Sequence, residues 1–418
     1  MRVLLPVLCA ILLPWLSLQA EDTLRVTLRQ ADSLLAARSL ALVAQQAEID
    51  KAEAERIQAR LFHNPQFSSE WVVGRTGEPF IHAGAGGQKI LAVEQLFRIA
   101  GQRSLAVRAA ENGKRITEAQ YAELAAALRL KLHSTLYRQY YTQRSVDAIA
   151  SQLQLLKQLQ EAYGGQYDKG NVSLKQVTRL RTAFFALNAQ RIQLLRQLNR
   201  DQQDLRAMLA ETGTVIASPT AAELQLPTAI PLPPDTLVSM AVQQRHAAVA
   251  AQAAQEAAAL DLKLQRRMAV PDLALGAQYN QVGDLHPRQT AVTIGFSVPL
   301  FDRNQGRIRW AEAAGKHAEA TLRQTQLDVR NEVLYALEHI RVLQEQLDAT
   351  NPGLDAQLDQ LSESLVDNYV RNNIKLIEFT DLFESYNSTI IDLNQLMADL
   401  QNAYEELEYA TGRNLFGR

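Results

Sequence analysis

A strand-to-helix junction that occurs twice constrains this chain more than any other feature. In the second copy, residues 290–300 alternate strictly between apolar residues and small or polar ones, as a strand with two different faces does. From Arg307 onward the chain is rich in Ala, Glu, Gln and Leu, which predicts a long helix. In the first copy Leu96-Phe97 and Arg103 correspond to Leu300-Phe301 and Arg307, each 204 positions earlier. The 418 residues are therefore expected to form two copies of one unit.

The N-terminus has the pattern of a secretory signal peptide. An almost unbroken apolar run follows Arg2 and ends at Ala20, before two acidic residues, so cleavage is expected after Ala20 and residues 1–20 are assigned to the signal. The only cysteine, Cys9, lies in this run, which excludes disulfides and thiol chemistry from the mature chain. No later run of 18 apolar residues exists, so any membrane-spanning segment would have to be a strand.

Formal charge is nearly balanced, with 43 Lys and Arg against 45 Asp and Glu. No basic run would follow a phosphate backbone, so nucleic acid is not an expected partner.

The first repeat is assigned to residues 21–212. Residues 23–61 are helical in composition, and Asn64-Pro65 ends that helix because the residue before proline avoids the helical region. Gly164-Gly165 and Gly170 with Asn171 are expected to break the long helix that follows. The predicted limits are strands at about 65–75 and 87–97, a helical hairpin over 101–211 with a seam of coiled-coil type, and a tip near 164–173.

The second repeat, residues 235–418, follows a proline-rich linker at residues 213–234, where five of the thirteen prolines fall. The predicted order is the same as in the first repeat. It comprises an Ala-rich helix over 235–268, strands at about 271–282 and 290–300, a helical hairpin over 305–411, and a tip near 369–376.

Four strands of about ten residues are long enough to cross a bilayer as tilted barrel strands. Four strands cannot close on themselves, and lipid does not tolerate an open edge. A trimer that pools twelve strands solves both problems. A small soluble sheet that caps helical hairpins is the alternative.

Several motifs occur in a fixed order along the two repeats: Asn64-Pro65 followed by Glu70, the junctions at 94–103 and 298–306, and the paired turns at 167–174 and 369–376. Together they resemble the motifs of the TolC family of outer membrane efflux channels, and are most similar to the branch that serves cobalt-zinc-cadmium and related heavy-metal efflux pumps.

The resemblance implies a mainly α-helical fold with a transmembrane β-barrel. A homotrimer would form a 12-stranded barrel in the outer membrane of a Gram-negative bacterium, in contact with its lipid, and an α-helical barrel in the periplasm. The implied partners are a periplasmic adaptor protein and an inner-membrane pump of the RND class. The channel would be a passive duct and not an enzyme, without a cofactor or a catalytic or metal-binding residue.

The resemblance also implies that the two helical turns form a periplasmic tip that contacts the adaptor. The second turn has Ile374 where a basic residue is often found, which puts an ionic latch of the family type in doubt. Helix termination alone is the alternative role. The tip positions are Tyr167, Gly170, Ser173, Tyr369, Asn372 and Leu376.

Glu378 and Asp381 lie on one helix face, three positions apart, where such channels place acidic rings at the pore mouth. Three copies of each carboxylate around one axis would favour cations. An ordinary solvated helix face is the alternative, and the first repeat has Gln176 and Arg179 at these positions.

Two further groups of residues are predicted from the repeat and from the strands. The strand-to-helix junctions comprise Leu96, Phe97, Gly101, Arg103, Pro299, Leu300, Phe301, Gly306 and Arg307. A possible aromatic girdle comprises Trp71, Phe80, Tyr279 and Phe296, for which packing within the sheet is the alternative. His82 and His286 fall in predicted external loops, where contact with exported metal is open but isolated surface histidines are commoner.

The cargo stays open at this stage. A drug-efflux or type I secretion channel would have the same architecture, and a periplasmic coiled-coil adaptor or scaffold is a different class. A familiar adaptor has one helical hairpin between compact β domains, whereas this sequence predicts two hairpins and four strands.

Overall fold

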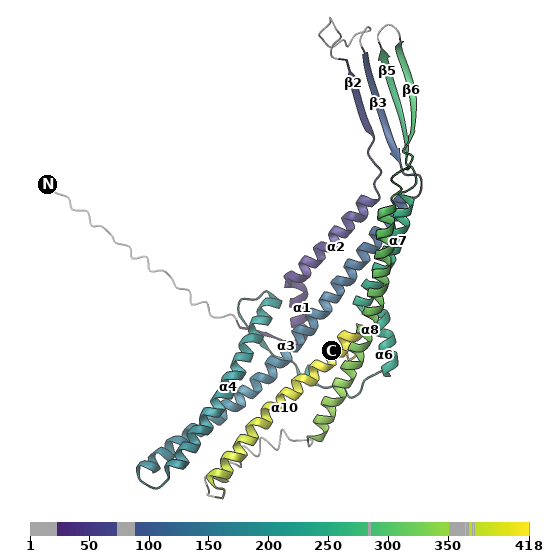
Figure 1. Cartoon of the computed structure of the whole chain (residues 1–418). Coiled ribbons are helices and arrows are strands. Elements are labelled where there is room, and N and C mark those ends of the chain that lie inside the picture. The colour runs from purple at the N-terminus through teal and green to yellow at the C-terminus, as the bar shows by residue number, and fades with distance from the viewer. Residues whose placement is uncertain are drawn as a thin grey trace, which may run out of the picture. The chain divides into compact units, whose positions relative to one another are not determined.

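The computed structural model describes residues 23–72, 88–282, 286–350, 364, 368–369, 371 and 373–417 (Figure 1). The predicted signal peptide, Phe80, His82 and Asn372 lie outside the described residues, and so does the side chain of His286. The chain forms two compact units, and each combines segments of both repeats. Unit 1 comprises Met1–Leu35, Leu132–Leu224 and Asp355–Ala398, and unit 2 comprises Ala36–Lys131, Gln225–Leu354 and Asp399–Arg418.

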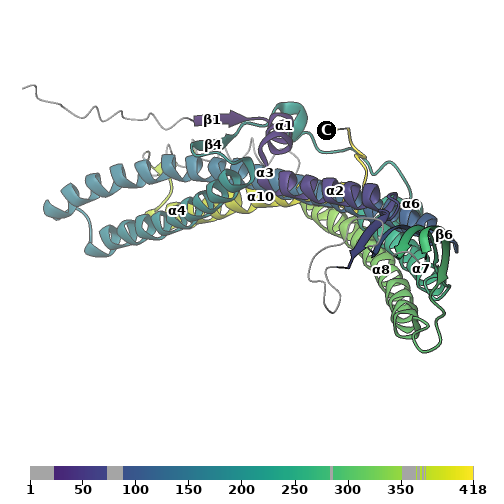
Figure 2. The same cartoon turned by 90° about the horizontal axis from the view of Figure 1, so that it is seen from above.

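Unit 1 contains a two-stranded parallel sheet that the sequence did not predict. Strand β1 (Thr23–Val26) pairs with β4 (Thr214–Ala217), next to helix α1 (Leu28–Arg38), as Figure 2 shows. The buried Gln139 amide bridges to β4, because its Nε2 donates to the Val215 carbonyl at 2.9 Å and its Oε1 accepts from the Ala217 N–H at 2.7 Å. The start of the expected helix at 23–61 and the start of the expected linker are therefore both strand.

The long helices of unit 1 are the second part of α3 (Gln102–Asp168), α4 (Leu174–Leu209) and the first part of α10 (Leu376–Thr411). The short helix α5 (Ala221–Leu224) follows β4. Gly164 and Gly165 lie inside α3, so the expected break at these glycines was wrong. The helix ends only at Asp168, and its last backbone carbonyls are capped there by the turn described below. The buried core of these helices comprises Ile149, Leu153, Leu156, Leu180, Leu187, Tyr369, Leu376, Phe379 and Phe383.

Unit 2 contains a four-stranded antiparallel sheet in the order β2-β3-β5-β6 (Figure 1). The strands are β2 (Gln66–Trp71), β3 (Gln88–Phe97), β5 (Leu273–Val282) and β6 (His286–Phe296). The two repeats meet at β3 and β5, which pair in register from Gln88 and Val282 to Phe97 and Leu273. These two strands are therefore the inner strands of the sheet, and each has a neighbouring strand on both sides.

The last strand is shifted toward the N-terminus relative to the expectation of 290–300. It begins at His286 and ends at Phe296, opposite Leu273, the first residue of β5. Beyond this point β5 offers no further backbone partner, and Pro299 has no N–H to donate. Pro299, Leu300 and Phe301 therefore lie in the connection to the next helix and not in the strand.

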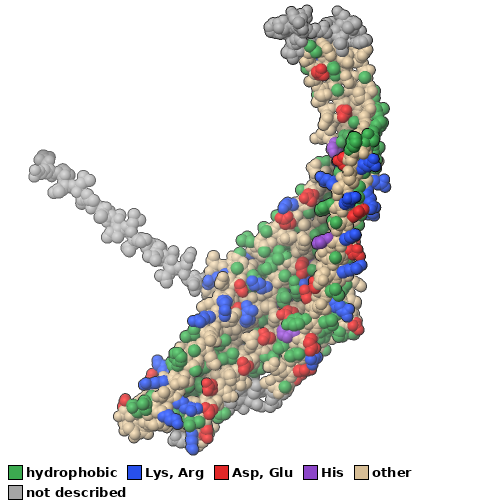
Figure 3. All heavy atoms as spheres, viewed as in Figure 1, with side chains coloured by type: hydrophobic (Ala, Val, Ile, Leu, Met, Phe, Trp, Pro, Cys, Tyr) green, Lys and Arg blue, Asp and Glu red, His purple; other side chains and the backbone are tan. Residues whose placement is uncertain are grey.

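The sheet has two different faces, which follow from the register. One face carries large apolar residues in each strand, including Phe67, Val93, Leu275, Val292 and Ile294, and the other carries small or polar ones such as Ser68, Glu94, Gly276, Gln278 and Thr293. On the view in Figure 3, charged side chains cover the helices, while the strands show few.

The helices of unit 2 are α2 (Leu40–Ala59), α6 (Pro234–Gln244), α7 (His246–Arg267), α8 (Gln305–Ala349), the first part of α3 and the last part of α10. No helix of the described residues has the length and the apolar character that crossing a membrane requires. The single helix expected at 235–268 is divided at Arg245, whose ψ of 129° is not helical.

The Arg245 guanidinium is buried in unit 2 and explains this division. It donates to the Glu123 carboxylate at 2.8 Å and lies 3.4 Å from the centre of the Tyr409 ring. Tyr409 donates its hydroxyl to the same carboxylate at 2.8 Å, and burial is the main cause that raises its pKa to about 12. Leaving the helical conformation at this one residue lets the guanidinium reach both partners.

The core of unit 2 joins α6, α8 and α10 with parts of the linker and the chain end. Leu226 and Ile230 of the linker and Leu415 and Phe416 of the chain end pack against it. Glu408 holds the chain end, because its Oε1 accepts from the backbone N–H of Leu415 at 2.7 Å and of Phe416 at 2.8 Å. The fully buried core comprises Leu237, Ala241, Val333, Ile340, Leu400, Ala403 and Leu407.

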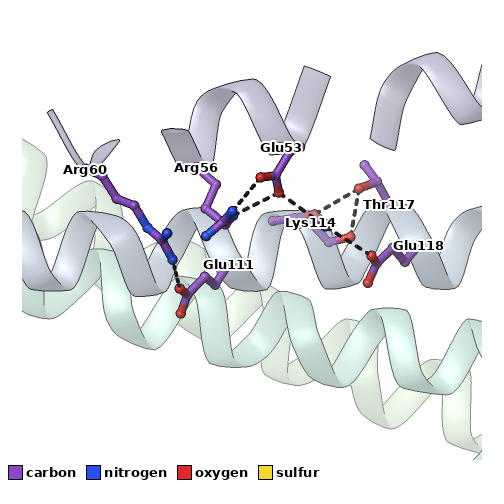
Figure 4. Close-up of polar contacts among 8 residues, drawn as sticks. Glu53, Arg56, Arg60, Glu111, Lys114, Thr117 and Glu118 are labelled. Atoms are coloured by element: carbon purple, nitrogen blue, oxygen red, sulfur yellow. Dashed lines mark hydrogen bonds and ion pairs between the residues drawn. The ribbon is translucent and has the colours of Figure 1, made fainter. Parts of the chain in front are cut away.

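Ion pairs join α2 to α3 on the surface of unit 2 (Figure 4). Glu53 accepts from Arg56 on its own helix and pairs with Lys114 of α3 at 3.2 Å, and these contacts lower its pKa to about 2. Arg60 reaches Glu111 at 3.3 Å. Basic side chains on this surface thus have carboxylate partners.

We expect Gly276→Ala to lower the free energy of unfolding by about 1–3 kcal/mol, as overpacking does. A Cβ at Gly276 would lie 2.4 Å from Thr293 Oγ1 and 3.0 Å from the Val93 carbonyl oxygen. Gly295→Ala is the matched control, because its Cβ would lie 3.7 Å from the nearest atom, the Cβ of Ala274. Thermal unfolding followed by circular dichroism measures the difference, and equal midpoints for the two variants would contradict it.

Candidate functional site at the helical turns and strand junctions

The first helical turn of unit 1 ends α3 with a glycine in the left-handed region. Gly170 has a φ of 77° and donates its N–H to the Tyr167 carbonyl at 2.8 Å, and Asn171 donates to the Gln166 carbonyl at 2.9 Å. These two bonds form a Schellman motif, in which glycine is favoured at this position because it has no Cβ. The turn is thus built by Gly170, as the sequence predicted, and not by the glycine pair before it.

The second turn repeats the contacts of Asn171, 202 positions later. Asn373 donates its backbone N–H to the Asn368 carbonyl at 2.8 Å and its side-chain amide to Asn368 Oδ1 at 3.0 Å. In the first turn the Asn171 side chain donates to Gln166 Oε1 at 2.7 Å. Asparagine and its partner five positions earlier therefore close both turns.

The helices that leave the two turns begin with the same cap. Gln176 Oε1 accepts from the Ser173 N–H at 2.8 Å, and Glu378 Oε2 accepts from the Lys375 N–H at 3.0 Å. Each acceptor is the third residue of its helix, as in a capping box. Glu378, predicted as a pore carboxylate, therefore has a structural role in the single chain as well.

Asp381 forms an ion pair across the two repeats. Arg179 donates to Asp381 Oδ1 at 2.6 Å and to the Thr380 hydroxyl at 2.7 Å. The side chains of Arg179 and Asp381 are 37% and 62% exposed, so the pair contributes at most about 1 kcal/mol to stability. A groove of about 580 Å³ lies beside it, lined by residues of α4 together with Thr380 and Glu384.

Sequence reasoning placed Arg179 and Asp381 at equivalent positions of the two repeats but did not predict their contact. Their opposite charges at equivalent positions were the available signal, because helices related by the repeat bring such positions together.

Two of the predicted tip residues belong to the core of unit 1. Tyr369 and Leu376 are each 8% exposed. Tyr369 stacks between Tyr163 and Phe379, with ring centres 6.3 Å and 4.6 Å away, and donates its hydroxyl to Tyr163. Burial, followed by this hydrogen bond, raises the pKa of Tyr369 well above its usual range. Tyr167, Gly170 and Ser173 are exposed, so they alone of the described tip residues present a free surface in this chain.

The strand-to-helix junctions of unit 2 correspond at a spacing of 203, not 204. Gly101 (φ 76°) and Asn304 (φ 56°) are both left-handed and directly precede α3 and α8. The next residue, Gln102 or Gln305, accepts the backbone N–H two positions before it at 3.0 Å and 2.7 Å. Asn304 was missed by sequence reasoning, although Asn is the residue after Gly that best tolerates this conformation.

The predicted junction residues therefore differ in setting between the repeats. Leu96 and Phe97 lie in β3, and Arg103 lies in the first turn of α3, where its Nε donates to the Arg60 carbonyl at 2.8 Å. Gly306 and Arg307 lie in the first turn of α8, and Gly306 has no positive φ. The extra residue before Arg307 and the early end of β6 make the second junction longer.

The described girdle residues fall at two levels of the sheet. Trp71 and Tyr279 lie near the hairpin ends of β2 and β5, whereas Phe296 is in register with Leu273 and Phe97 at the helical end. Phe97, predicted only as a junction residue, is therefore a further aromatic at the lower level. Among the described residues, no group of three or more His, Cys, Asp or Glu is placed to hold a metal ion.

Comparison with known proteins gives a consistent result. Residues 237–413 match the family model of the outer membrane efflux protein. The cobalt-zinc-cadmium resistance protein CzcC of Cupriavidus metallidurans is 21% identical over 319 residues, which cover 76% of this chain and 73% of that protein.

Solved structures share the fold. A membrane protein from Pseudomonas aeruginosa has a TM-score of 0.77 at 16% identity, over 93% of this chain and 90% of its own. The channel CusC has a TM-score of 0.74 at 16% identity, over 93% and 92%. The matches to the family model and to CzcC agree with the family that the sequence resembles, and the solved structures show the fold alone.

We expect Glu378→Gln to leave the stability of the second turn nearly unchanged, because Gln176 makes the same cap with an amide oxygen. Glu378→Ala removes the acceptor and should cost about 1 kcal/mol. Chemical denaturation of the purified variants measures this difference. Equal losses for Gln and Ala would show that the charge of Glu378, and not its cap, stabilises the turn.

Proposed function

From the premise that this chain carries a domain of the outer membrane efflux protein family, we propose that it is the outer membrane channel of a tripartite efflux system. In this proposal the strands cross the outer membrane of a Gram-negative bacterium and the helices extend into the periplasm. The protein is a passive duct that catalyses no reaction.

The observation that carries the proposal is the two-faced sheet. Its large apolar residues gather on one face, and many of them, including Phe67, Val292 and Ile294, are exposed in the single chain. The opposite face carries small and polar residues, apart from Ile90 and Leu96 of β3. Barrel strands in a membrane alternate in this way, with apolar residues toward lipid and polar residues toward the lumen.

The open edges of the sheet support a trimer. Within the described residues, β2 and β6 are each paired on one side only, and exposed edges are not tolerated in lipid. If β6 of one chain pairs with β2 of the next, three chains close a barrel of twelve strands. The two aromatic levels fit its two interfaces, because Phe296 and the partner of Tyr279, Thr290, are six residues or roughly 20 Å apart along β6.

The helical turns are the proposed contact with a periplasmic adaptor, through the exposed Tyr167, Gly170 and Ser173. The adaptor would join the channel to an inner-membrane pump of the RND class. The cargo we propose is heavy-metal cations, because the relative CzcC is named for cobalt, zinc and cadmium resistance. The duct would pass what the pump selects.

Val292→Lys and Ala291→Lys test the membrane-facing sheet with neighbouring positions on opposite faces. Lysine on the lipid face near the middle of the bilayer costs about 2–4 kcal/mol, whereas lysine on the lumen face is solvated. We expect wild type and Ala291→Lys to fractionate with the outer membrane as trimers in mild detergent, and Val292→Lys to lose most of its trimer. Membrane fractionation and the mass of the detergent-extracted protein measure this. A periplasmic monomer or dimer for the wild type would overturn the channel.

Arg179→Gln and Asp381→Asn test the pore mouth, which we propose Glu378 and Asp381 line. The Arg179 guanidinium neutralises Asp381 in the ion pair, so its removal should increase the preference for cations. Asp381→Asn leaves the guanidinium and should decrease that preference. Reversal potentials in planar bilayers under a salt gradient measure both changes, with Glu378→Gln as the variant that removes charge and keeps the cap. Unchanged potentials in all three would place these residues away from the conducting path.

A further inference from the structure

A concave site of about 370 Å³ lies at the first strand-to-helix junction of unit 2. It is formed by the end of α2 and the segment after it, the last residues of β3, and the first turns of α3. We call it the junction groove, and its principal lining residues are Gln58, Phe62, His63, Phe97, Arg98 and Arg103.

Two arginines line the junction groove, and neither has a carboxylate partner among the described residues. Arg103 donates its Nε to the Arg60 carbonyl at 2.8 Å, and its guanidinium carbon lies 3.9 Å from the centre of the Phe62 ring. Arg98 is exposed and directly follows β3. Within the part of the chain that the structure describes, neither side chain forms an ion pair.

The lack of a carboxylate partner distinguishes these two arginines from other basic residues on the same surface. A short distance along α2 and α3, Arg56, Arg60 and Lys114 each pair with a glutamate (Figure 4). Carboxylates therefore neutralise the basic residues of this face up to the junction and not at it. The charge that remains is suited to an anion, and a guanidinium held by an aromatic face presents its other N–H groups to a phosphate in fixed geometry.

The second junction repeats the pattern with different residues. Arg303, Arg307 and Arg309 are exposed and, among the described residues, form no ion pair. Two large apolar side chains accompany them, Phe301 at 93% exposure and Trp310 at 67%. In Figure 3, blue basic and green apolar side chains lie together where the strands meet the helices.

We propose that the junction groove binds the phosphate of an anionic phospholipid in the inner leaflet of the outer membrane. This rests on the proposed function, which places the base of the strands at that leaflet. The groove joins the apolar face of the sheet at Phe97, and Phe62 and Ile99 are 67% and 62% exposed beside the two arginines. Guanidinium groups next to exposed aromatic and aliphatic side chains match a headgroup phosphate with its acyl chains better than they match a free anion.

The test compares thermal stabilisation of the purified, full-length protein in mild detergent by phosphatidylglycerol, phosphatidylcholine and inorganic phosphate. The variants are Arg98→Gln, the double variant Arg98→Gln with Arg103→Gln, and the control Arg330→Gln. Arg330 is also an exposed arginine without a described ion pair, but it lies on α8 far from the junction. The single variant Arg98→Gln controls for misfolding of the double variant, because Arg98 makes none of the contacts that hold Arg103 in place.

Phosphatidylglycerol should stabilise the wild type and Arg330→Gln more than phosphatidylcholine does. The apparent affinity should fall about fivefold for Arg98→Gln and about thirtyfold for the double variant, from roughly 1 kcal/mol for each basic residue near an anionic lipid surface. Equal effects of both lipids, equal losses in Arg330→Gln, or stabilisation by inorganic phosphate alone would overturn the lipid site. A wild-type protein absent from the outer membrane would instead overturn the proposed function, so the two failures are distinguishable.

Discussion

The pairing of β3 with β5 is the interaction on which the rest of unit 2 depends. It joins the first repeat to the second through ten matched residue pairs, from Gln88 and Val282 to Phe97 and Leu273. Because the register fixes which side chains share a face, a slip of one residue would place Val93 on the face of Gly276 and Gln278, and Leu275 on the face of Glu94. One ladder of backbone hydrogen bonds thus determines the two-faced character of the whole sheet.

The repeats have diverged in length and not in the capping contacts. Equivalent contacts are separated by 202 positions at the helical turns, from Asn171 to Asn373, and by 203 at the strand junctions, from Gln102 to Gln305. Between these anchors the first repeat is one residue longer than the second, and there the segment is almost wholly the continuous helix α3. Side chains that satisfy the orphan N–H groups of a helix or turn are constrained more strongly, because each loss leaves a backbone group without a partner.

The sequence predicted the order of strands and long helices, because their periodicity spans many residues. It failed where one contact between residues far apart in the sequence determines the local structure. The end of β6 at Phe296 depends on where β5 begins, the interruption at Arg245 depends on Glu123 and Tyr409, and β1 exists only because β4 pairs with it. Of the candidate tip residues, Gly170 could be placed from local turn chemistry, whereas the burial of Tyr369 depends on Tyr163, about 200 residues away.

The arginines of this chain show why residue type alone does not define a role. Arg245 is buried and bonded to Glu123, and Arg179 is half-exposed and paired with Asp381. Arg103 is held by a carbonyl and an aromatic ring and, within the described part of the chain, pairs with no carboxylate. The first arrangement fixes the chain where two helices meet, since removing Glu123 would leave the buried Arg245 charge with only the more distant Glu332, at 3.6 Å. The second is weak enough to exchange partners in an assembly. In the third, the backbone and the ring orient the guanidinium without neutralising it, so its charge stays available to a ligand from outside the chain.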